Sequence, residues 1–364
     1  MDNQEQIIHD LIQLNSMMAD QIEALRSENS ILRDEIGHLK QDFSAIVNGQ
    51  KTILETISRN QHEVKMLGET MTRSIDNLPY EIGKGSVLAP KVTTIEATVD
   101  LLIHSRASIC RFGDGEFSIM MGCSRQGFQH QDGLLAKRLT EVVKSNHENC
   151  LIAIADNYSS LENYSNMSKN EIRYYMTKEV RMGHISLLEP ERVYYNAYIT
   201  TPYMLYADRD TDQPKKRFDK LKQIWEKRDI IIVEGCLSRL GVGNDLFDGA
   251  NSIRRILCPA EHAFDRYNEI LEEATKLGNS LGKDNVIYII ALGPTATVLA
   301  YDLFTQGFQA MDLGHIDNDY EYYIHHATDR YAIPGKYVNN VTKIDQVENI
   351  NNKTYEGQIE KRIY

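Results

Sequence analysis

A heptad repeat of apolar residues runs through residues 8–78 and restricts this part of the chain to a long, supercoiled helix. In one unbroken frame, apolar side chains fill 16 of the 21 a and d positions, and no proline occurs before Pro79. A seam that persists over so many heptads is typical of a coiled coil. We therefore expect residues 1–78 to form a coiled-coil oligomerisation stalk.

The residues along this seam favour a dimer. Isoleucine at a with leucine at d favours two parallel strands, and Asn15 and Asn29, both at a positions, would fix the register. We expect a homodimer, with a trimer as the less favoured state. The alternative is a long helix packed on its own domain, but the stripe is narrow and the other faces are polar. Prolines and glycines then end the repeat, so residues 79–93 are expected to be a linker.

Residues 94–338 alternate between short apolar runs and amphipathic segments. Strands are expected at 108–112, 151–155, 230–233, 253–258, 286–292 and 310–313, and helices at 95–104, 134–146, 170–182, 218–227, 263–277 and 295–306. This alternation predicts an α/β domain with a mostly parallel sheet and helices on both faces. The polar, asparagine-rich residues 339–364 are expected to be an extended or disordered tail.

Charge and cysteine content narrow the function classes. The formal net charge of −12 argues against non-specific electrostatic binding to nucleic acid or to an anionic membrane. Five cysteines without a C-x-x-C pair predict free thiols in a reducing cytoplasm rather than disulfides or a structural zinc site. The first residues lack the features of a signal peptide, and no apolar run approaches the ~20 residues that span a bilayer. We expect a cytoplasmic protein without a transmembrane segment.

Two carboxylates follow the first strand of the α/β domain. Asp114 and Glu116 stand two residues apart, and Gly113 and Gly115 precede them. If the backbone stays extended, both carboxylates point to the same side, and the glycines let a ligand approach the backbone. Paired oxygen ligands suit Mg²⁺ or Mn²⁺ carrying a diphosphate, with Arg111 delivered by the same strand. The alternative is an acidic turn in solvent.

Other strand ends supply further candidates, because ligands of parallel sheets bind beyond the carboxyl ends of the strands. The second strand delivers Asp156 and Asn157. The third leads into a glycine-rich loop that contains a cation but lacks the third glycine of a dinucleotide fingerprint. The strand at 286–292 leads into a helix start whose free amides could hold an anion, with a threonine that can cap it. The candidates for binding phosphate are Arg111, Gly113, Arg239, Gly241, Gly243, Asn244, Asp245, Gly293 and Thr295. A surface salt bridge for the arginine and a simple strand-to-helix turn are the alternatives.

The last strand ends in a loop that concentrates one imidazole and several carboxylates. His315 and Asp317 are two residues apart, as are Asp319 and Glu321. Such a cluster can supply a metal ligand, a general base or a partner for a sugar hydroxyl. The alternative is a solvated acidic loop.

Four sequence blocks resemble a bacterial glycosyltransferase family with the GT-D fold, first catalogued as a domain of unknown function. The blocks are RFGDGE at 111–116, SRLGVGNDLF at 238–247, LGPTAT at 292–297 and GHID-x-x-x-E at 314–321. The resemblance covers about residues 95–338 and departs from the expected pattern at Asn318 and Asp319. It implies a Rossmann-like domain that uses a UDP-sugar and Mn²⁺ or Mg²⁺, with Asp114 and Glu116 facing the metal.

The resemblance also implies work on bacterial surface glycans, including those built on serine-rich adhesins, so the expected partners are a UDP-sugar and a glycan or glycoprotein acceptor. Glu321 or Asp317 is the candidate base for the acceptor hydroxyl, and His315 would orient the sugar or the metal. Two alternatives remain open. One is a metal-dependent nucleotide-sugar hydrolase, and the other is a non-catalytic scaffold with a degenerate enzyme domain.

Overall fold

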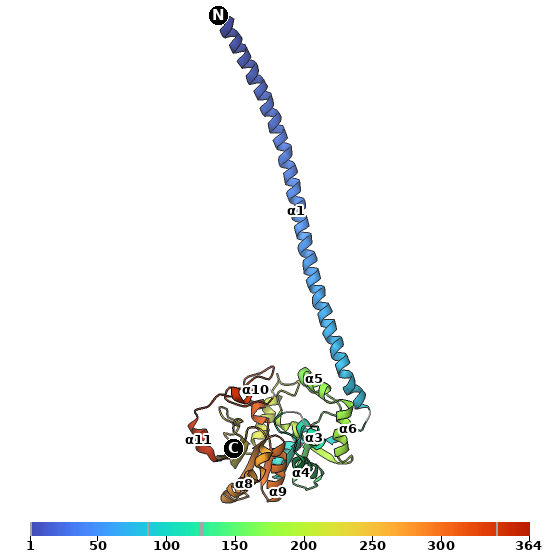
Figure 1. Cartoon of the computed structure of the whole chain (residues 1–364), viewed down its shortest axis with the longest axis vertical. Coiled ribbons are helices and arrows are strands. Elements are labelled where there is room, and N and C mark those ends of the chain that lie inside the picture. The colour runs from blue at the N-terminus through green and yellow to red at the C-terminus, as the bar shows by residue number, and fades with distance from the viewer. Residues whose placement is uncertain (1, 86, 124–126, 340) are drawn as a thin grey trace. The chain divides into compact units, whose positions relative to one another are not determined.

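The computed structural model describes residues 2–85, 87–123, 127–339 and 341–364. The chain forms two compact units, Met1–Ile75 and Asp76–Tyr364. In the first unit the chain is a single helix without interruption, the first part of α1 (Asp2–Lys84) (Figure 1). Its heptad side chains are solvent-exposed in the single chain, with Ile22 at 50% and Leu39 at 67%. The structure therefore confirms the helix, whereas the pairing of two such helices stays a prediction.

The second unit begins inside the same helix. Residues 79–84, which were predicted to belong to a linker, are the end of this helix. α1 continues through Pro79 to Lys84, and Tyr80 is only 1% exposed. The Tyr80 hydroxyl lies 3.1 Å from the carbonyl oxygen of Asn157 and 3.0 Å from that of Ser159. Packing and hydrogen bonding thus hold the last turns of α1 in place, because a buried tyrosine needs a partner for its hydroxyl.

In the described part of the second unit the strands form one nine-stranded sheet, in the order β1-β4-β3-β2-β8-β7-β5-β6-β9. Every pairing between these strands is parallel. The strands are β1 (Lys91–Val92), β2 (Ser108–Phe112), β3 (Cys150–Ile154), β4 (Val193–Asn196), β5 (Asp229–Gly235), β6 (Ser252–Cys258), β7 (Val286–Ala291), β8 (Gln309–Asp312) and β9 (Ile359–Arg362). The predicted α/β class with a mostly parallel sheet is confirmed.

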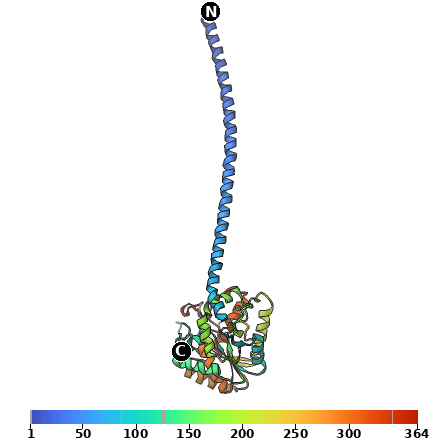
Figure 2. The ribbon, with the colours of Figure 1, turned by 90° about the vertical axis from the view of Figure 1, so that its right-hand side faces the viewer.

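Helices cover both faces of this sheet, as the two views in Figures 1 and 2 show. Their bounds are α2 (Ile95–His104), α3 (Asp114–Met120), α4 (Gly133–Lys144), α5 (Asn166–Tyr175), α6 (Lys178–Leu187), α7 (Gln213–Lys222), α8 (Tyr267–Leu281), α9 (Pro294–Thr305), α10 (Ile316–Ile324) and α11 (Lys353–Gln358). Side-chain caps start several of them: Thr94 caps α2, Asp132 caps α4 and Ser165 caps α5. Each cap satisfies a backbone N–H that the helix leaves free.

Two hydrophobic cores lie on opposite faces of the sheet. Side chains of α4, α8 and α9 pack in the first core, and those of α2, α7 and α10 pack in the second. Along β2 the side chains alternate between them, with Cys110 and Phe112 in the first core and Ile109 in the second. This is the period-two pattern of a strand buried on both faces. Cys110 and the other four cysteines are free, as predicted.

Three predicted segments differ from the structure. Residues 170–182 belong to two helices, α5 and α6, rather than one. α7 ends at Lys222, so Trp225 follows the helix, where its indole N–H donates to the carbonyl of Leu246. The polar tail forms α11 and then β9, which pairs with β6. Backbone hydrogen bonds to the edge of the sheet keep β9 in place, although its residues are mostly polar.

The chain leaves two neighbouring strands toward opposite faces of the sheet. After β2 it enters α3, whose Phe117 packs in the first core, and after β8 it enters α10, whose Ile316 packs in the second. In open α/β sheets, ligands bind outside the carboxyl ends of the strands where the connections diverge in this way. The ends of β2 and β8 are therefore the first place to examine for a site.

Candidate functional site

The ends of β2 and β8 are joined by a buried ion pair. The Arg111 guanidinium lies 2.7 Å from Oδ1 of Asp312 and also donates to the Asp312 carbonyl and to the Thr200 hydroxyl. The Thr297 hydroxyl of α9 lies 2.8 Å from the Arg111 carbonyl and 3.2 Å from Oδ2 of Asp312. Charged groups that are paired and hydrogen-bonded in this way hold one geometry. Arg111 thus fixes the relative position of two strand ends.

Asp114 and Glu116 lie in the first turn of α3, not in extended backbone. This corrects the predicted geometry, because residues two apart on a helix are rotated by roughly 200° around its axis. The Asp114 side chain is exposed, whereas Glu116 is half-buried. Oε2 of Glu116 accepts a hydrogen bond of 2.7 Å from the backbone N–H of Gly113. Glu116 therefore caps the helix, and Asp114 is the more accessible of the two carboxylates.

The electrostatics around Glu116 are unusual for a carboxylate near the surface. Burial, with the nearby negative charge of Asp312, raises the pKa of Glu116 to about 7, although the Gly113 N–H opposes the shift. A carboxyl group that ionises near neutral pH at a strand end marks a candidate functional site, because structural acids are more often paired. A bound cation would favour its ionised form.

His315 lies at the start of α10, directly after β8. Its side chain is accessible to solvent, yet desolvation by the surrounding protein, aided by the Arg111 and Arg330 charges, lowers the pKa of His315 to about 4. The imidazole is therefore neutral at physiological pH and can both donate and accept hydrogen bonds. We group Arg111, Asp114, Glu116, Asp312 and His315 as the β2 end site.

A second cluster, the α10 network, contains the other two predicted catalytic residues. The Lys336 ammonium lies 2.6 Å from Oδ2 of Asp317 and 2.7 Å from Oε1 of Glu321. The Asn244 amide donates to both carboxylates, and the Gly241 N–H donates to Asp317. All three charged side chains are at least nine-tenths buried. This network fastens the glycine-rich loop onto α10, which is a positioning role rather than that of a free base.

The other charged candidates in the glycine-rich loop also bind groups of the protein itself. Nη1 of Arg239 donates to the carbonyls of Gly335 and Glu348, so its charge is directed at backbone oxygens rather than at a ligand. Asp245 is bound by Lys222 and by the Tyr320 hydroxyl, which lower its pKa. Gly243 is the exception, with a left-handed φ of 90° and no heavy atom within 4 Å of a built Cβ.

The start of α9 is covered rather than open. Gly293 has a left-handed φ of 55° and is the N-cap residue, so Thr295 is not the cap that the sequence predicted. A Cβ on Gly293 would lie 2.5 Å from the Phe128 ring, and the Thr295 side chain is fully buried. Glycine is required at this position both for its φ and for this close approach. The helix start lies near α3, because a Cβ on Gly115 would lie 3.7 Å from the Pro294 ring.

The structure therefore divides the predicted site residues. It brings Arg111, Gly113, Asp114, Glu116 and His315 together at the β2 end site, and Gly241, Asn244, Asp317 and Glu321 in the α10 network. The residues that sequence reasoning missed are Asp312, Thr297 and Lys336. Asp312 was the next-to-last residue of the predicted strand 310–313, which was its only signal. Lys336 lies within the range of the family resemblance, but its partners are 15 and 19 residues away in the sequence, so spacing gave no sign of the pairing.

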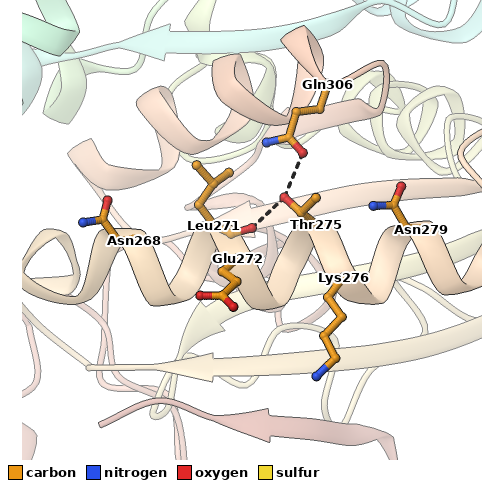
Figure 3. Close-up of a pocket in the computed structure, with 7 residues that line it drawn as sticks. All are labelled: Asn268, Leu271, Glu272, Thr275, Lys276, Asn279 and Gln306. Atoms are coloured by element: carbon orange, nitrogen blue, oxygen red, sulfur yellow. Dashed lines mark hydrogen bonds between the residues drawn. The ribbon is translucent and has the colours of Figure 1, made fainter.

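A surface hollow lies elsewhere, away from these strand ends. It has a volume of about 570 Å³ and runs along α8. Figure 3 shows Asn268, Glu272, Lys276 and Asn279 along this helix, with the Thr275 hydroxyl between the Leu271 carbonyl and Gln306. None of the sequence-predicted site residues lines it, so it adds nothing to the site at the strand ends.

The donor set at the β2 end site fits a cation that is bound together with a phosphate ligand. Within residues that the structure describes, no group of three or more His, Cys, Asp or Glu side chains is arranged to hold a metal ion. Mg²⁺ and Mn²⁺ need no such cage, because one or two carboxylates with substrate phosphates and water complete their shell. Asp114 is accessible, and Glu116 keeps Oε1 outside its helix-capping bond. Although they are rotated apart around α3, the Asp114 charge adds to the raised pKa of Glu116, so the two carboxylates lie near one another. These two residues are the ones that would hold the ion.

Fold and site together define a doubly wound α/β domain with an acidic ligand site at the carboxyl ends of its strands. Comparison with known proteins is more specific. Residues 109–341 match the family described as "Glycosyltransferase GT-D fold". Two solved domains of unknown function 1792 superpose on this chain. One, described as having a distinct glycosyltransferase fold, gives a TM-score of 0.69 at 32% identity and covers 80% of this chain and 100% of that domain. The other, described as a new glycosyltransferase from Streptococcus sanguinis, gives 0.70 at 33% identity and covers 76% and 100%.

The chain belongs to the GT-D glycosyltransferase family. It is similar to glycosyltransferase GlyD of Streptococcus pneumoniae, with 31% identity over 94% of this chain and 40% of that protein. It also resembles the probable glycosyl transferase Gly of Streptococcus gordonii, with 35% identity over 74% of this chain and 38% of that protein. The chain thus spans about two fifths of the length of these relatives. In the described residues, no helix is both long and apolar enough to cross a membrane.

Proposed function

We propose that this chain transfers a sugar from a UDP-sugar to a hydroxyl of a glycan or glycoprotein, with Mn²⁺ or Mg²⁺ as cofactor. The single observation that carries the proposal is the β2 end site. In a GT-D family domain it places an accessible carboxylate, Asp114, beside a half-buried one, Glu116, whose pKa is raised to about 7. The relatives named as glycosyltransferases support the reaction class, and the acceptor we propose is a bacterial surface glycan.

The transfer exchanges one bond for another. The acceptor oxygen bonds to the anomeric carbon of the sugar, the bond from that carbon to the diphosphate oxygen breaks, and UDP leaves with the electron pair. The acceptor proton passes to a base. Asp114 and Glu116 would hold a divalent cation, which when bound would supply Lewis-acid stabilisation of the departing charge.

The chain's own residues divide the remaining work. Arg111 holds the ends of β2 and β8 together, and the neutral His315 imidazole can orient a sugar or phosphate oxygen. Asp317 and Glu321 keep the glycine-rich loop in place through Lys336 and Asn244. The paired state of both carboxylates favours positioning over proton transfer, which revises the base assignment expected from the sequence.

A donor screen tests this proposal. The intact chain is incubated with UDP-glucose, UDP-galactose or UDP-N-acetylglucosamine, with Mn²⁺ or with EDTA, and UDP release is measured. Release that requires both the metal and an added sugar acceptor supports the transferase. Mass spectrometry of the product separates the rival hydrolase, which would give free sugar instead of an extended glycan. No UDP release from any donor would refute the proposal.

We also propose that two copies of the chain pair through α1. The supporting observation is the row of exposed apolar side chains at heptad spacing, since monomeric proteins rarely expose so long a stripe. Asn15 and Asn29 at a positions would select the parallel, in-register dimer. Two active units on one stalk would raise the effective concentration for a repetitive acceptor. The five free cysteines fit a reducing compartment, and we propose the cytoplasm.

Light scattering of the intact chain tests the pairing. A mass of two chains is expected, and the double substitution Leu25→Lys and Leu32→Lys, both at d positions, should yield monomers. Glu23→Lys and Ser30→Lys, placed away from the a and d seam, are the matched control and should leave the mass unchanged. A monomeric wild-type chain would refute the dimer.

A further inference from the structure

Three adjacent strands end in polar side chains at the same level of the sheet. The parallel register places Phe112 of β2 opposite Ile154 of β3, and Ile154 opposite Asn196 of β4. Two residues beyond these partners come Asp114, Asp156 and Tyr198. The electrostatics agree, because burial raises the pKa of Tyr198 and the charges of Asp114 and Asp156 both add to that rise.

Beside Tyr198, a buried amide has an oxygen atom without a partner. Asn157 is 5% exposed, and its Nδ2 lies 3.1 Å from the Tyr198 hydroxyl. Its Oδ1 is buried and accepts no hydrogen bond from any residue that the structure describes. A buried polar atom left unpaired costs free energy, and such atoms in a native fold call for an explanation. A ligand that donates a hydrogen bond here would remove that cost.

Asp156 is the second group without a protein partner. No hydrogen bond or ion pair of its carboxylate occurs within the described ranges, although the side chain is half-buried. Its desolvation raises its pKa. In contrast, Asp312, Asp317 and Asp319 at neighbouring strand ends each accept hydrogen bonds from the protein. An ionised carboxylate is an acceptor only, so the partner that suits Asp156 is a donor such as a hydroxyl.

Three tyrosine rings lie near these two groups. The ring centroids of Tyr164 and Tyr198 are 5.9 Å apart, and those of Tyr164 and Tyr206 are 5.4 Å apart, both edge to face. The Asp156 charge contributes to the raised pKa of both Tyr164 and Tyr206, which places all three near one another. Aromatic walls with a few converging polar groups are typical of small-molecule sites. A hexose matches them, because it has apolar C–H faces and hydroxyl edges.

We propose that Asp156, Asn157 and Tyr198 form a subsite that binds the hydroxyl edge of a hexose. The subsite lies on the β3–β4 side of Asp114, whereas α9 and the glycine-rich loop lie on the side of β7 and β5. If the diphosphate of the donor lies at Asp114, a sugar would therefore lie at Asp156. This sugar would be either the one carried by the donor or the one that accepts the transfer. This inference rests on the proposed function, because that function places the diphosphate at Asp114. A donor sugar and an acceptor sugar offer the same hydroxyl groups to the subsite.

The test measures binding of sugar and of nucleotide separately. Asp156→Asn and Tyr198→Phe remove the carboxylate charge and the hydroxyl with little change in shape. Asp284→Asn, at the opposite end of the sheet and with a 98% exposed side chain, is the matched control. UDP and UDP-glucose are titrated by calorimetry with Mn²⁺, and methyl β-glucoside is titrated by saturation-transfer NMR. Trp225 fluorescence during urea unfolding checks that each variant is folded.

If the subsite holds the donor sugar, Asp156→Asn should weaken UDP-glucose about 10- to 100-fold, the range for one hydrogen bond to a charged group, while UDP binds as before. If it holds the acceptor, UDP-glucose binding is unchanged and methyl β-glucoside binding is lost. Unchanged binding of both sugars in the two variants would overturn the subsite, as would a wild-type chain that binds neither sugar. A wild-type chain that binds methyl β-glucoside through Asp156 but not UDP would refute the proposed function alone.

Discussion

The β2 end site and the α10 network are two charged clusters on the same edge of one sheet, and they differ in how their charges are satisfied. In the α10 network, Asp317 and Glu321 share one ammonium and one amide, and all the charged groups are buried. In the β2 end site, Asp114 is exposed and Glu116 has a pKa raised to about 7. The first cluster resembles a completed structural network, and the second resembles a site awaiting a ligand.

This difference indicates which acidic residues take part in the reaction and which stabilise the fold. Both clusters are acidic, both follow strands, and both belong to sequence blocks of the same family. Burial and binding by a lysine separate them, because a buried carboxylate bound by lysine contributes to stability and leaves little for a substrate. The contrast predicts that substitutions in the α10 network will affect folding, whereas those in the β2 end site will affect turnover.

The largest effect is expected from Lys336→Met. It leaves two buried carboxylates without their countercharge, so the free energy of unfolding should fall by about 3–5 kcal/mol. Urea unfolding followed through Trp225, the single tryptophan and fully buried, measures this in the second unit. Lys215→Met is the matched control, since its ion pair with Asp219 is more than half exposed and its loss should leave the free energy of unfolding nearly unchanged. Equal effects of the two substitutions would erase the contrast between the clusters.

Asp114→Asn should produce the next largest effect, on turnover alone. Loss of the accessible carboxylate should reduce metal-dependent UDP release by roughly 10²–10³-fold, comparable to the loss of one transition-state charge contact. The unfolding midpoint should stay at the wild-type value, because the side chain is exposed. Release at the wild-type rate, or an unfolding midpoint as low as that of Lys336→Met, would contradict the assignment.

Glu116→Gln should change how stability depends on pH. The folded-state pKa of about 7 lies above the usual value of 4.5, so between these values the folded chain holds a proton that the unfolded chain has lost. Stability therefore falls as pH rises from about 4.5 to 7. The glutamine keeps an oxygen that accepts from the Gly113 N–H, and it removes this loss of stability at higher pH. The loss should be about 1–2 kcal/mol, because the Glu116 side chain retains some contact with water. Parallel stability curves from pH 5 to 8 for the variant and the wild type would argue against the raised pKa.

The smallest effect is expected from Tyr80→Phe. The substitution removes the hydroxyl that binds the backbone at Asn157 and Ser159, and should cost about 1 kcal/mol of unfolding free energy. It should also reduce turnover a few-fold, because that backbone carries the residues beside Asp114. Tyr174→Phe, with a side chain on the surface, is the control. A loss of stability without any change in turnover would show that Tyr80 supports the fold alone.

Much of the fold followed from local patterns. Short apolar runs marked β2, β3, β5, β6, β7 and β8, because a parallel strand buried on both faces is apolar throughout. The segments that local patterns missed depend on tertiary contacts. β9 is polar and is ordered by pairing with β6, and the last turns of α1 continue past Pro79 because Tyr80 packs into the second unit.

The sequence by itself determined the heptad stripe, the α/β class, the family and the strand ends at which the functional residues lie, because all of these are written in periodicity and short motifs. Only the tertiary structure decided which carboxylates are buried against a lysine and which stay accessible to solvent. Lys336 neutralises Asp317 and Glu321 from a distant segment, and Asp312 adds to the raised pKa of Glu116 from a neighbouring strand. The free energy of a charge depends on the groups around it in space, and spacing along the chain does not record them.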